Sequence, residues 1–202
     1  NDLRSGKIER LNNENKRKAI FIDRDGVINK EVDNLSNIDD FELLSGVSDS
    51  IKKINNSEFL AIIITNQPVV AKGWCSFSEL KEIHNKMEYL LGNQNAFVDK
   101  IYFCPHHPDK GYEGENKDLK IECNCRKPKI GMIKLAEKEF NIDLNNSYFI
   151  GDTSTDIQTG FNAGLETFIV GTGYAGKDGK FNVIADNSTT NLESAVNKIL
   201  DK

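Results

Sequence analysis

The chain has 202 residues, of which 38% are hydrophobic and 28% are charged, a composition typical of a soluble protein with one well-buried domain. Its formal net charge of −5 argues against general binding to nucleic acid, although a local basic pocket can still take a small phosphorylated partner. No apolar run is long enough to cross a membrane and no signal segment opens the sequence, so we expect a cytoplasmic protein.

The first 18 residues are basic and contain little apolar sequence. They carry six Lys or Arg residues against three Asp or Glu residues, which is typical of a linker or docking arm on a protein surface. A leader that binds a polyanion is the alternative. The first residue is Asn1 and not methionine, which is compatible with a processed chain or with a piece of a longer polypeptide.

From residue 19 onward, short apolar runs alternate with helical patterns. Runs typical of buried strands cover residues 19–22, 59–64, 98–103, 148–150 and 167–170, and helical spacing covers residues 46–56, 76–91, 130–140, 157–163 and 191–200. Residues 29–45 show no sustained period and predict a long, functional loop or flap. The alternation predicts one α/β domain over residues 19–202, with a Rossmann-like, mostly parallel sheet and helices on both faces.

Two close pairs of soft metal ligands flank a polar loop at residues 104–125. The four candidate ligands are Cys104, His106, Cys123 and Cys125. Such pairs can close a tetrahedral Zn²⁺ site, and a metal would order a loop that has little to pack. His107 is an alternative ligand to His106, and a disulfide or plain thiols are alternatives to zinc. We expect a zinc-stapled loop, with Cys75 outside it as a small apolar residue.

Polar residues stand at the ends of the predicted strands and of the zinc loop. They are Asp23, Asp25, Thr65, Asn66, Arg126, Lys127 and Asp152. Because the carboxyl ends of parallel strands meet at one edge of a sheet, we expect these side chains to lie close together. Carboxylates from two strands suit Mg²⁺, and a neighbouring Lys and Arg suit a phosphoryl group.

Four motifs, in order along residues 19–170, resemble those of the haloacid dehalogenase-like phosphohydrolases. They are Asp23-x-Asp25-Gly26, Thr65 after an apolar strand, Lys127 before a helix, and Gly151-Asp152-x-x-x-Asp156. A single acidic turn is a weak signal, whereas four ordered motifs, each at its expected strand end, are specific.

The resemblance implies a role for each acidic residue. Asp23 would be the nucleophile that becomes an aspartyl phosphate, and Asp25 would protonate the leaving oxygen and then deprotonate the attacking water. Mg²⁺ would be held by the carboxylates of Asp23 and Asp152 and by the backbone carbonyl of Asp25. Asp156 is expected to support the metal site from outside its ligands, or else to be a plain helix-surface carboxylate. Arg24 is expected to be a solvated turn residue.

The same resemblance assigns the phosphate groups to basic and polar residues. Thr65 and Asn66 would hydrogen-bond the transferring phosphoryl group, and Lys127 would offset its charge while orienting Asp23. Arg126, which lies between a zinc ligand and Lys127, is the candidate for binding a second phosphate of the substrate. Weaker candidates for that role are Gln67 and Lys72.

Longer stretches narrow the resemblance to the heptose 1,7-bisphosphate phosphatases, with the histidinol-phosphate phosphatases as competitors. These stretches are Asp23-Arg24-Asp25-Gly26, Thr65-Asn66-Gln67, Cys104-Pro105-His106-His107-Pro108 and Cys123-x-Cys125-Arg126-Lys127-Pro128. They imply Mg²⁺-dependent hydrolysis of one phosphate of a heptose bisphosphate. The zinc would be structural and would roof the site in place of a large cap domain. Residues 3–8 and 111–115 look most like versions fused behind a sugar-phosphate nucleotidyltransferase.

The sequence departs from that family's pattern in the loop after residue 67. Pro68-Val69-Val70 stands where a small polar and glycine run is common, and Lys72 stands where arginine is usual, so the sugar and its anomer stay open. Two other functions remain as alternatives. One is a non-enzymatic, zinc-stapled binding module; the other is a phospho-acceptor receiver domain, against which the acidic pair on the first strand argues.

Overall fold

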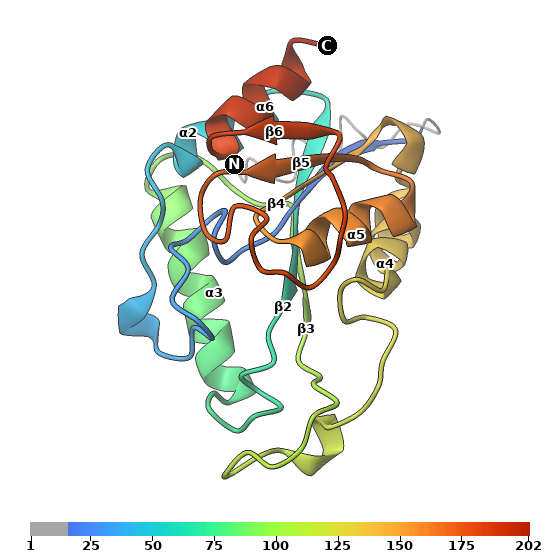
Figure 1. Ribbon diagram of the computed structural model, residues 1–202. Coiled ribbons are helices and arrows are strands. Elements are labelled where there is room, and N and C mark those ends of the chain that lie inside the picture. Colours follow the sequence, from blue (N-terminus) through green and yellow to red (C-terminus); the bar gives the residue numbers. More distant parts are fainter. Residues whose placement is uncertain (1–15) are drawn as a thin grey trace.

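The computed structural model describes residues 16–202, which form one six-stranded sheet in the order β3-β2-β1-β4-β5-β6. The strands are β1 (Lys18–Ile22), β2 (Phe59–Asn66), β3 (Lys100–Cys104), β4 (Tyr148–Gly151), β5 (Glu166–Val170) and β6 (Asn187–Thr189). Neighbouring strands all pair in parallel, so their carboxyl ends share one edge of the sheet (Figure 1). The predicted parallel α/β sheet is confirmed.

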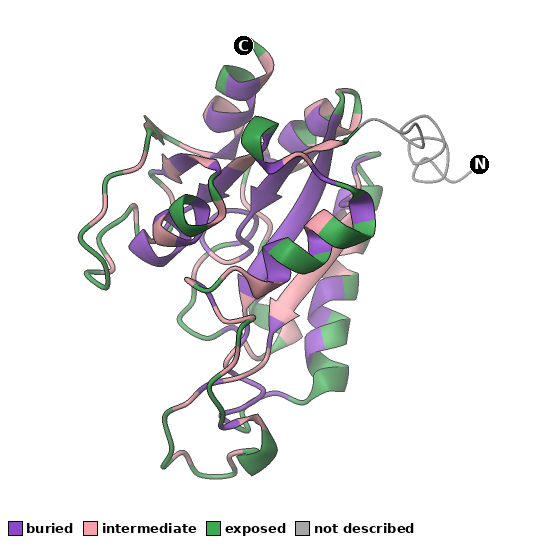
Figure 2. Cartoon of the chain, turned by 90° about the vertical axis from the view of Figure 1, so that its right-hand side faces the viewer, coloured by how far each residue is buried: buried purple, intermediate pink, exposed green. Residues whose placement is uncertain are grey.

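Strands β1 and β2 are almost entirely buried because both faces of the sheet are covered. In β1, Ala19 and Phe21 pack into one hydrophobic core, and Ile20 and Ile22 pack into the other, since successive side chains of a strand point to opposite faces. Every residue of β2 except its last is buried, as is typical of a strand inside a parallel sheet. Figure 2 shows this buried layer between helices whose outer faces are exposed.

Helices lie on both faces of the sheet, as predicted. They are α2 (Val47–Asn55), α3 (Phe77–Gly92), α4 (Gly131–Phe140), α5 (Ser154–Ala163) and α6 (Leu192–Leu200), with 3₁₀ turns η1 (Ile38–Asp40), η2 (Lys117–Leu119) and η3 (Leu144–Asn146). Apolar residues of α2, α3 and α6 pack into one core, and those of α4 pack into the other. Helix α5 contacts β4 and β5.

The structure differs from the sequence prediction in one additional strand and at several element boundaries. Strand β6 was not predicted, because its three residues are polar and only edge pairing with β5 makes them a strand. Helix α5 begins at Ser154 and not at residue 157, because Thr153 and Asp156 form a capping box at its start. Strand β1 begins at Lys18, the last residue assigned to the basic arm. The remainder of that arm, up to residue 15, lies outside the described residues, and so does the stretch 3–8.

Loops at the carboxyl edge of the sheet frame the site. They cover residues 23–46, 67–76, 105–130 and 171–186. The loop after β3, which contains η2 and is drawn yellow-green in Figure 1, extends farthest from the sheet. Within residues 16–202, no separate cap domain stands over this edge, and no helix there combines the length and apolarity needed to span a membrane.

Candidate active site

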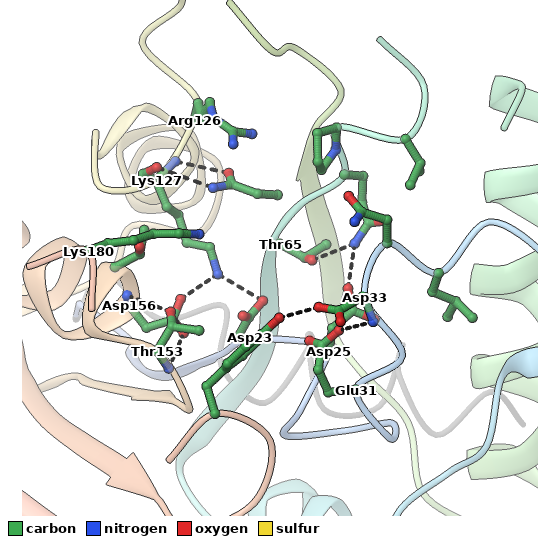
Figure 3. Close-up of a pocket in the computed structure, with 18 residues that line it drawn as sticks. Asp23, Asp25, Glu31, Asp33, Thr65, Arg126, Lys127, Thr153, Asp156 and Lys180 are labelled. Atoms are coloured by element: carbon green, nitrogen blue, oxygen red, sulfur yellow. Dashed lines mark hydrogen bonds and ion pairs between the residues drawn. The ribbon is translucent and has the colours of Figure 1, made fainter. Parts of the chain in front are cut away.

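A cavity of about 200 Å³ opens at the carboxyl edge of the sheet. Its walls include Asp23, Asp25, Thr65, Asn66, Gln67, Arg126, Lys127 and Asp156. These residues come from the ends of β1 and β2, from the loop before α4 and from the first turn of α5 (Figure 3). The structure therefore brings together most of the polar residues that the sequence placed at strand ends.

Lys127 lies between two buried carboxylates. Its Nζ is 2.8 Å from Asp23 Oδ1 and 2.6 Å from Asp156 Oδ1, and Figure 3 shows both contacts. Although burial alone would favour the neutral amine, Asp156 and Asp23 outweigh it and raise the pKa of Lys127 above its ordinary value. The lysine is therefore a fixed positive charge beside Asp23.

Asp156 is fully buried, so the helix-surface alternative for this residue is wrong. Its Oδ2 accepts hydrogen bonds from the Thr153 backbone N–H (3.1 Å) and from Thr153 Oγ1 (2.6 Å), while its Oδ1 accepts from Lys127. A Cβ at Gly151 would lie 2.2 Å from Asp156 Cβ, so only glycine fits there. The helix cap, the strand end and the lysine together fix this carboxylate.

Asp23, Asp152 and Asp156 form an acidic cluster in which one oxygen of each lies within 4.8 Å of the others. Asp152 Oδ2 accepts a hydrogen bond from the Tyr174 backbone N–H (2.8 Å). Burial first, and then the neighbouring carboxylates, raise the pKa of Asp152 to about 9. Burial and Asp156, opposed by Lys127, raise the pKa of Asp23 to about 7.

This cluster fits a magnesium ion. Asp156 already accepts from Lys127 and Thr153, so the carboxylates left for a cation are those of Asp23 and Asp152. Two hard oxygen donors, of which Asp23 lines the cavity, match the way Mg²⁺ is usually held, with waters and substrate completing its ligands. A cation would also remove the electrostatic cost that raises both pKa values. The side chain of Asp25 is not part of the cluster.

Asp25 is held by its neighbours in the chain and by Gln67, which directly follows β2. Its carboxylate accepts from Arg24, from Asn29 Nδ2 (2.9 Å) and from Gln67 Nε2 (2.9 Å). Although burial opposes it, Arg24 and these hydrogen bonds together lower the pKa of Asp25. Arg24 itself has no exposed surface, so the expectation of a solvated turn residue is wrong; its partners are Asp25 and His84.

Residues 65–67 support the site from the end of β2. Gln67 Nε2 donates to Thr65 Oγ1 (2.8 Å) as well as to Asp25. The Asn66 carboxamide bonds both backbone groups of Lys127, with Oδ1 accepting from N–H at 3.0 Å and Nδ2 donating to C=O at 3.2 Å. Gln67 thus holds the side chains of Thr65 and Asp25, and Asn66 holds the backbone of Lys127. Direct contact of Gln67 and Asn66 with a substrate stays a prediction.

Arg126 and Lys72 occupy different positions around the cavity. Arg126 lines it, and its Nη1 donates to the His106 carbonyl at 3.3 Å. Lys72 is buried and is not part of the wall; its Nζ donates to Asn34 Oδ1 (3.0 Å) and lies 4.5 Å from the centre of the Trp74 ring.

The sequence analysis missed several residues of the wall, four of which have ionisable side chains. These four are Glu31, Asp33, Tyr174 and Lys180. Glu31 and Asp33 belong to the flap at residues 29–45, and the Tyr174 hydroxyl bonds the Asp33 carboxylate across the cavity mouth. The glycine-rich loop after β5 was a usable signal, because it too follows the carboxyl end of a strand.

A second cluster of metal-ligand type lies in the loop after β3. It contains Cys104, His106, Cys123 and Cys125. The three sulfur–sulfur distances are 3.5, 3.1 and 3.3 Å, and His106 Nδ1 lies 3.2 Å from Cys125 Sγ. Three thiols and one imidazole around a common centre are a donor set that suits tetrahedral Zn²⁺. His107 lies outside the cluster, where its Nδ1 accepts from the Asp109 N–H.

Known proteins with similar sequences and structures are phosphatases. A model of the HAD-hydrolase-like family matches residues 124–192. The D-glycero-alpha-D-manno-heptose-1,7-bisphosphate 7-phosphatase of Photorhabdus laumondii is 37% identical over 183 residues, covering 90% of this chain and 98% of that enzyme. The D-glycero-beta-D-manno-heptose-1,7-bisphosphate 7-phosphatase of Haemophilus ducreyi is 37% identical over 155 residues, covering 76% of this chain and 82% of that enzyme.

The solved structures include a similar enzyme with ligands bound. The D,D-heptose 1,7-bisphosphate phosphatase from B. bronchiseptica, complexed with magnesium and phosphate, superposes with a TM-score of 0.79 at 29% identity. The match covers 91% of this chain and 98% of that one.

Between pH ~4 and 9, the metal-free folded protein should bind protons at Asp23 and Asp152 that the unfolded chain has already released. The free energy of unfolding without metal should therefore fall as pH rises. Both folded pKa values lie above the ordinary value for Asp, so this contribution is complete below pH ~4 and is lost through pH 7 to 9. Each group contributes at most about 1.4 kcal/mol per pH unit. Urea unfolding in EDTA at pH 5, 7 and 9 measures it.

Asp152→Asn provides the control for that measurement. The variant should lose the contribution of Asp152 over the whole range from pH ~4 to 9, which leaves a shallower slope below pH 7 and almost none between pH 7 and 9, because an amide has no proton to release. If its pH profile coincides with that of the wild type, Asp152 is not a proton-binding group in the folded state.

Proposed function

The chain belongs to the HAD-like family of D-glycero-D-manno-heptose-1,7-bisphosphate 7-phosphatases, and we propose that it removes the 7-phosphate of such a bisphosphate through an aspartyl phosphate on Asp23. This activity is that of a phosphomonoester hydrolase, and we place it in the cytoplasm. The observation that carries the residue assignment is the pair of Asp23 and a permanently charged Lys127 at 2.8 Å, next to a carboxylate cluster that suits Mg²⁺.

In the first step, an oxygen of Asp23 would attack the phosphorus of the substrate, and the bond between phosphorus and the sugar oxygen would break. Asp25, which lines the same cavity, would give the departing oxygen a proton. Lys127 would compensate the negative charge that collects on the phosphoryl oxygens. Mg²⁺ held by Asp23, Asp152 and the backbone carbonyl of Asp25 would let two anions approach each other.

In the second step, a water oxygen would bond to phosphorus, and the bond from phosphorus to Asp23 would break. The proton of that water would go to Asp25, which is then ready to act as an acid again. The products would be inorganic phosphate and the sugar 1-phosphate. Thr65 lines the cavity and would hydrogen-bond the phosphoryl group in both steps.

The second phosphate of the substrate would bind beside Arg126. Burial first, and then the positive charges of Arg126 and Lys120, lower the pKa of Lys72, so these cations repel one another in the free protein. Lys180 also lines the cavity and adds positive charge. An anion between Arg126 and Lys72 would relieve this repulsion, which favours a bisphosphate over a monophosphate.

The zinc would be structural and would hold the loop that carries Arg126. Arg126 follows a cluster cysteine directly, and it bonds the carbonyl of His106, which is another member of the cluster. The same loop packs on residues 67–76. The Asn116 N–H donates to the Ala71 carbonyl at 3.0 Å, and a Cβ at Gly73 would lie 2.0 Å from the Gly114 carbonyl oxygen.

The relatives named for the alpha and for the beta heptose bisphosphate have the same sequence identity to this chain. Which anomer this chain hydrolyses must therefore be measured. Phosphate release should be measured for the α and β heptose 1,7-bisphosphates and for histidinol phosphate, with Mg²⁺ and with EDTA. We expect Mg²⁺-dependent turnover of at least one bisphosphate. Asp23→Asn should lower it by more than about a thousandfold, because it removes the nucleophile.

Asp201→Asn, an exposed change at the end of α6, is the control for Asp23→Asn and should keep full activity. Turnover of histidinol phosphate alone would refute the heptose assignment. An active Asp23→Asn variant would refute the assignment of the nucleophile.

Arg126→Gln should raise KM for the bisphosphate by roughly 10- to 100-fold, as expected for loss of one charge-assisted hydrogen bond. The same variant should leave KM for heptose 7-phosphate nearly unchanged, because that substrate has no second phosphate. Lys129→Gln, which removes an exposed cation of the same loop, is the matched control. Equal losses on both substrates would contradict a role of Arg126 at the second phosphate.

The purified protein should contain one Zn²⁺ per chain, measurable by elemental analysis. Cys123→Ser should lose the metal, lower the melting temperature and raise KM for the bisphosphate, because the loop that carries Arg126 loses its order. Cys75→Ser is the matched control, since Cys75 is buried outside the cluster. A Cys123→Ser variant with normal zinc content or normal KM would argue against the structural role.

A further inference from the structure

Arg24 is the largest side chain without exposed surface among the described residues. A buried guanidinium is costly unless its donors are satisfied, so its partners are informative. Its Nη2 lies 2.8 Å from Asp25 Oδ1 and 2.9 Å from Asp25 Oδ2, and its Nε lies 3.1 Å from Oδ1. On its other side, Nη1 lies 3.1 Å from His84 Nε2. Arg24 therefore connects the carboxylate of Asp25 with helix α3.

The partner on α3 accepts the hydrogen bond. A guanidinium has donors only, so His84 Nε2 presents its lone pair, and the imidazole is neutral. Burial and then Arg24 lower the pKa of His84 to about 3, in agreement with that arrangement. The ring of His84 is itself held by Phe103 at the end of β3, with centroids 5.6 Å apart.

The donors around Asp25 define the orientation of its carboxylate. Arg24 contacts both oxygens, Asn29 contacts Oδ1 and Gln67 contacts Oδ2. The side chain still keeps 20% of its surface exposed and lines the cavity. If Arg24 were free to turn, the contact that spans both oxygens would be lost, and the carboxylate would keep only one side-chain hydrogen bond at each oxygen, from Asn29 and from Gln67.

We propose that His84 and Arg24 are positioning residues for Asp25: His84 fixes the guanidinium, and the guanidinium fixes the carboxylate that takes the proton from the attacking water. This inference rests on the proposed function of Asp25. The step concerned is hydrolysis of the aspartyl phosphate, in which the bond from water oxygen to phosphorus forms, the bond from Asp23 to phosphorus breaks, and the water proton goes to Asp25. Proton transfer requires this carboxylate within hydrogen-bond reach of the water.

The test uses p-nitrophenyl phosphate with Mg²⁺. Nitrophenolate leaves without needing a proton, so Asp25 is needed only in the second step, the hydrolysis of the aspartyl phosphate. His84→Leu removes the acceptor, whereas His84→Gln keeps one at the position of Nε2. His84→Leu should release a burst of nitrophenolate equal to the enzyme, followed by turnover about tenfold slower than wild type, with KM lowered in the same proportion and kcat/KM nearly unchanged, because only the second step is slowed. His84→Gln should stay within about threefold of wild type.

Two further variants separate positioning from folding. Met87→Ala, a buried change on the same helix, should lower the melting temperature without producing a burst. Arg24→Lys keeps the charge but not the two-oxygen contact, so it should also produce the burst. It therefore tests the positioning role even where His84→Leu does not fold.

The outcomes distinguish this inference from the proposed function. A wild type that hydrolyses no phosphomonoester would overturn both. If the wild type turns over p-nitrophenyl phosphate, two results would overturn the positioning role alone. One is a folded His84→Leu variant of normal rate, and the other is an equal loss of rate in His84→Leu and His84→Gln.

Discussion

The buried ion triad of Asp23, Lys127 and Asp156 is the constraint on which the rest of the site depends. Three charged groups can lie inside a protein only if each has partners, and every partner here comes from a different part of the chain. The lysine is delivered by the loop before α4 and is held through its backbone by Asn66 of β2. The second carboxylate is held by the cap of α5. The sheet therefore acts as a frame that brings distant residues to one charge arrangement.

Much of this arrangement was accessible from the sequence, for a definite physical reason. Long β-branched runs such as residues 59–64 are buried in almost any α/β context, and polar residues directly after such runs must lie at the carboxyl edge of a parallel sheet. Asp23, Thr65 and Asp152 were found in that way. The short polar strand β6 was not, because three residues without an apolar pattern carry no signal of their own.

The errors concern burial that depends on long-range contacts. Arg24 was expected to be solvated because its neighbours in the sequence are those of a polar turn, but it is buried by His84, which lies 60 positions away. The contact of the Asn66 carboxamide could not be predicted from the sequence either, because its partner is the backbone of Lys127, 61 positions away. Local patterns predict which elements form, whereas contacts between loops from different strands decide which polar side chains they cover.

The acidic cluster leaves no room for side chains at the glycines around it. A Cβ at Gly26 would lie 2.2 Å from Asp152 Oδ2, and one at Gly173 would lie 2.1 Å from the same atom; both glycines also have left-handed backbones. With Gly151 of β4 against Asp156, glycines from two loops and one strand end lie against two carboxylates. A side chain at any of these three positions would displace Asp152 or Asp156, so the geometry of the acidic cluster depends on residues that have no functional group.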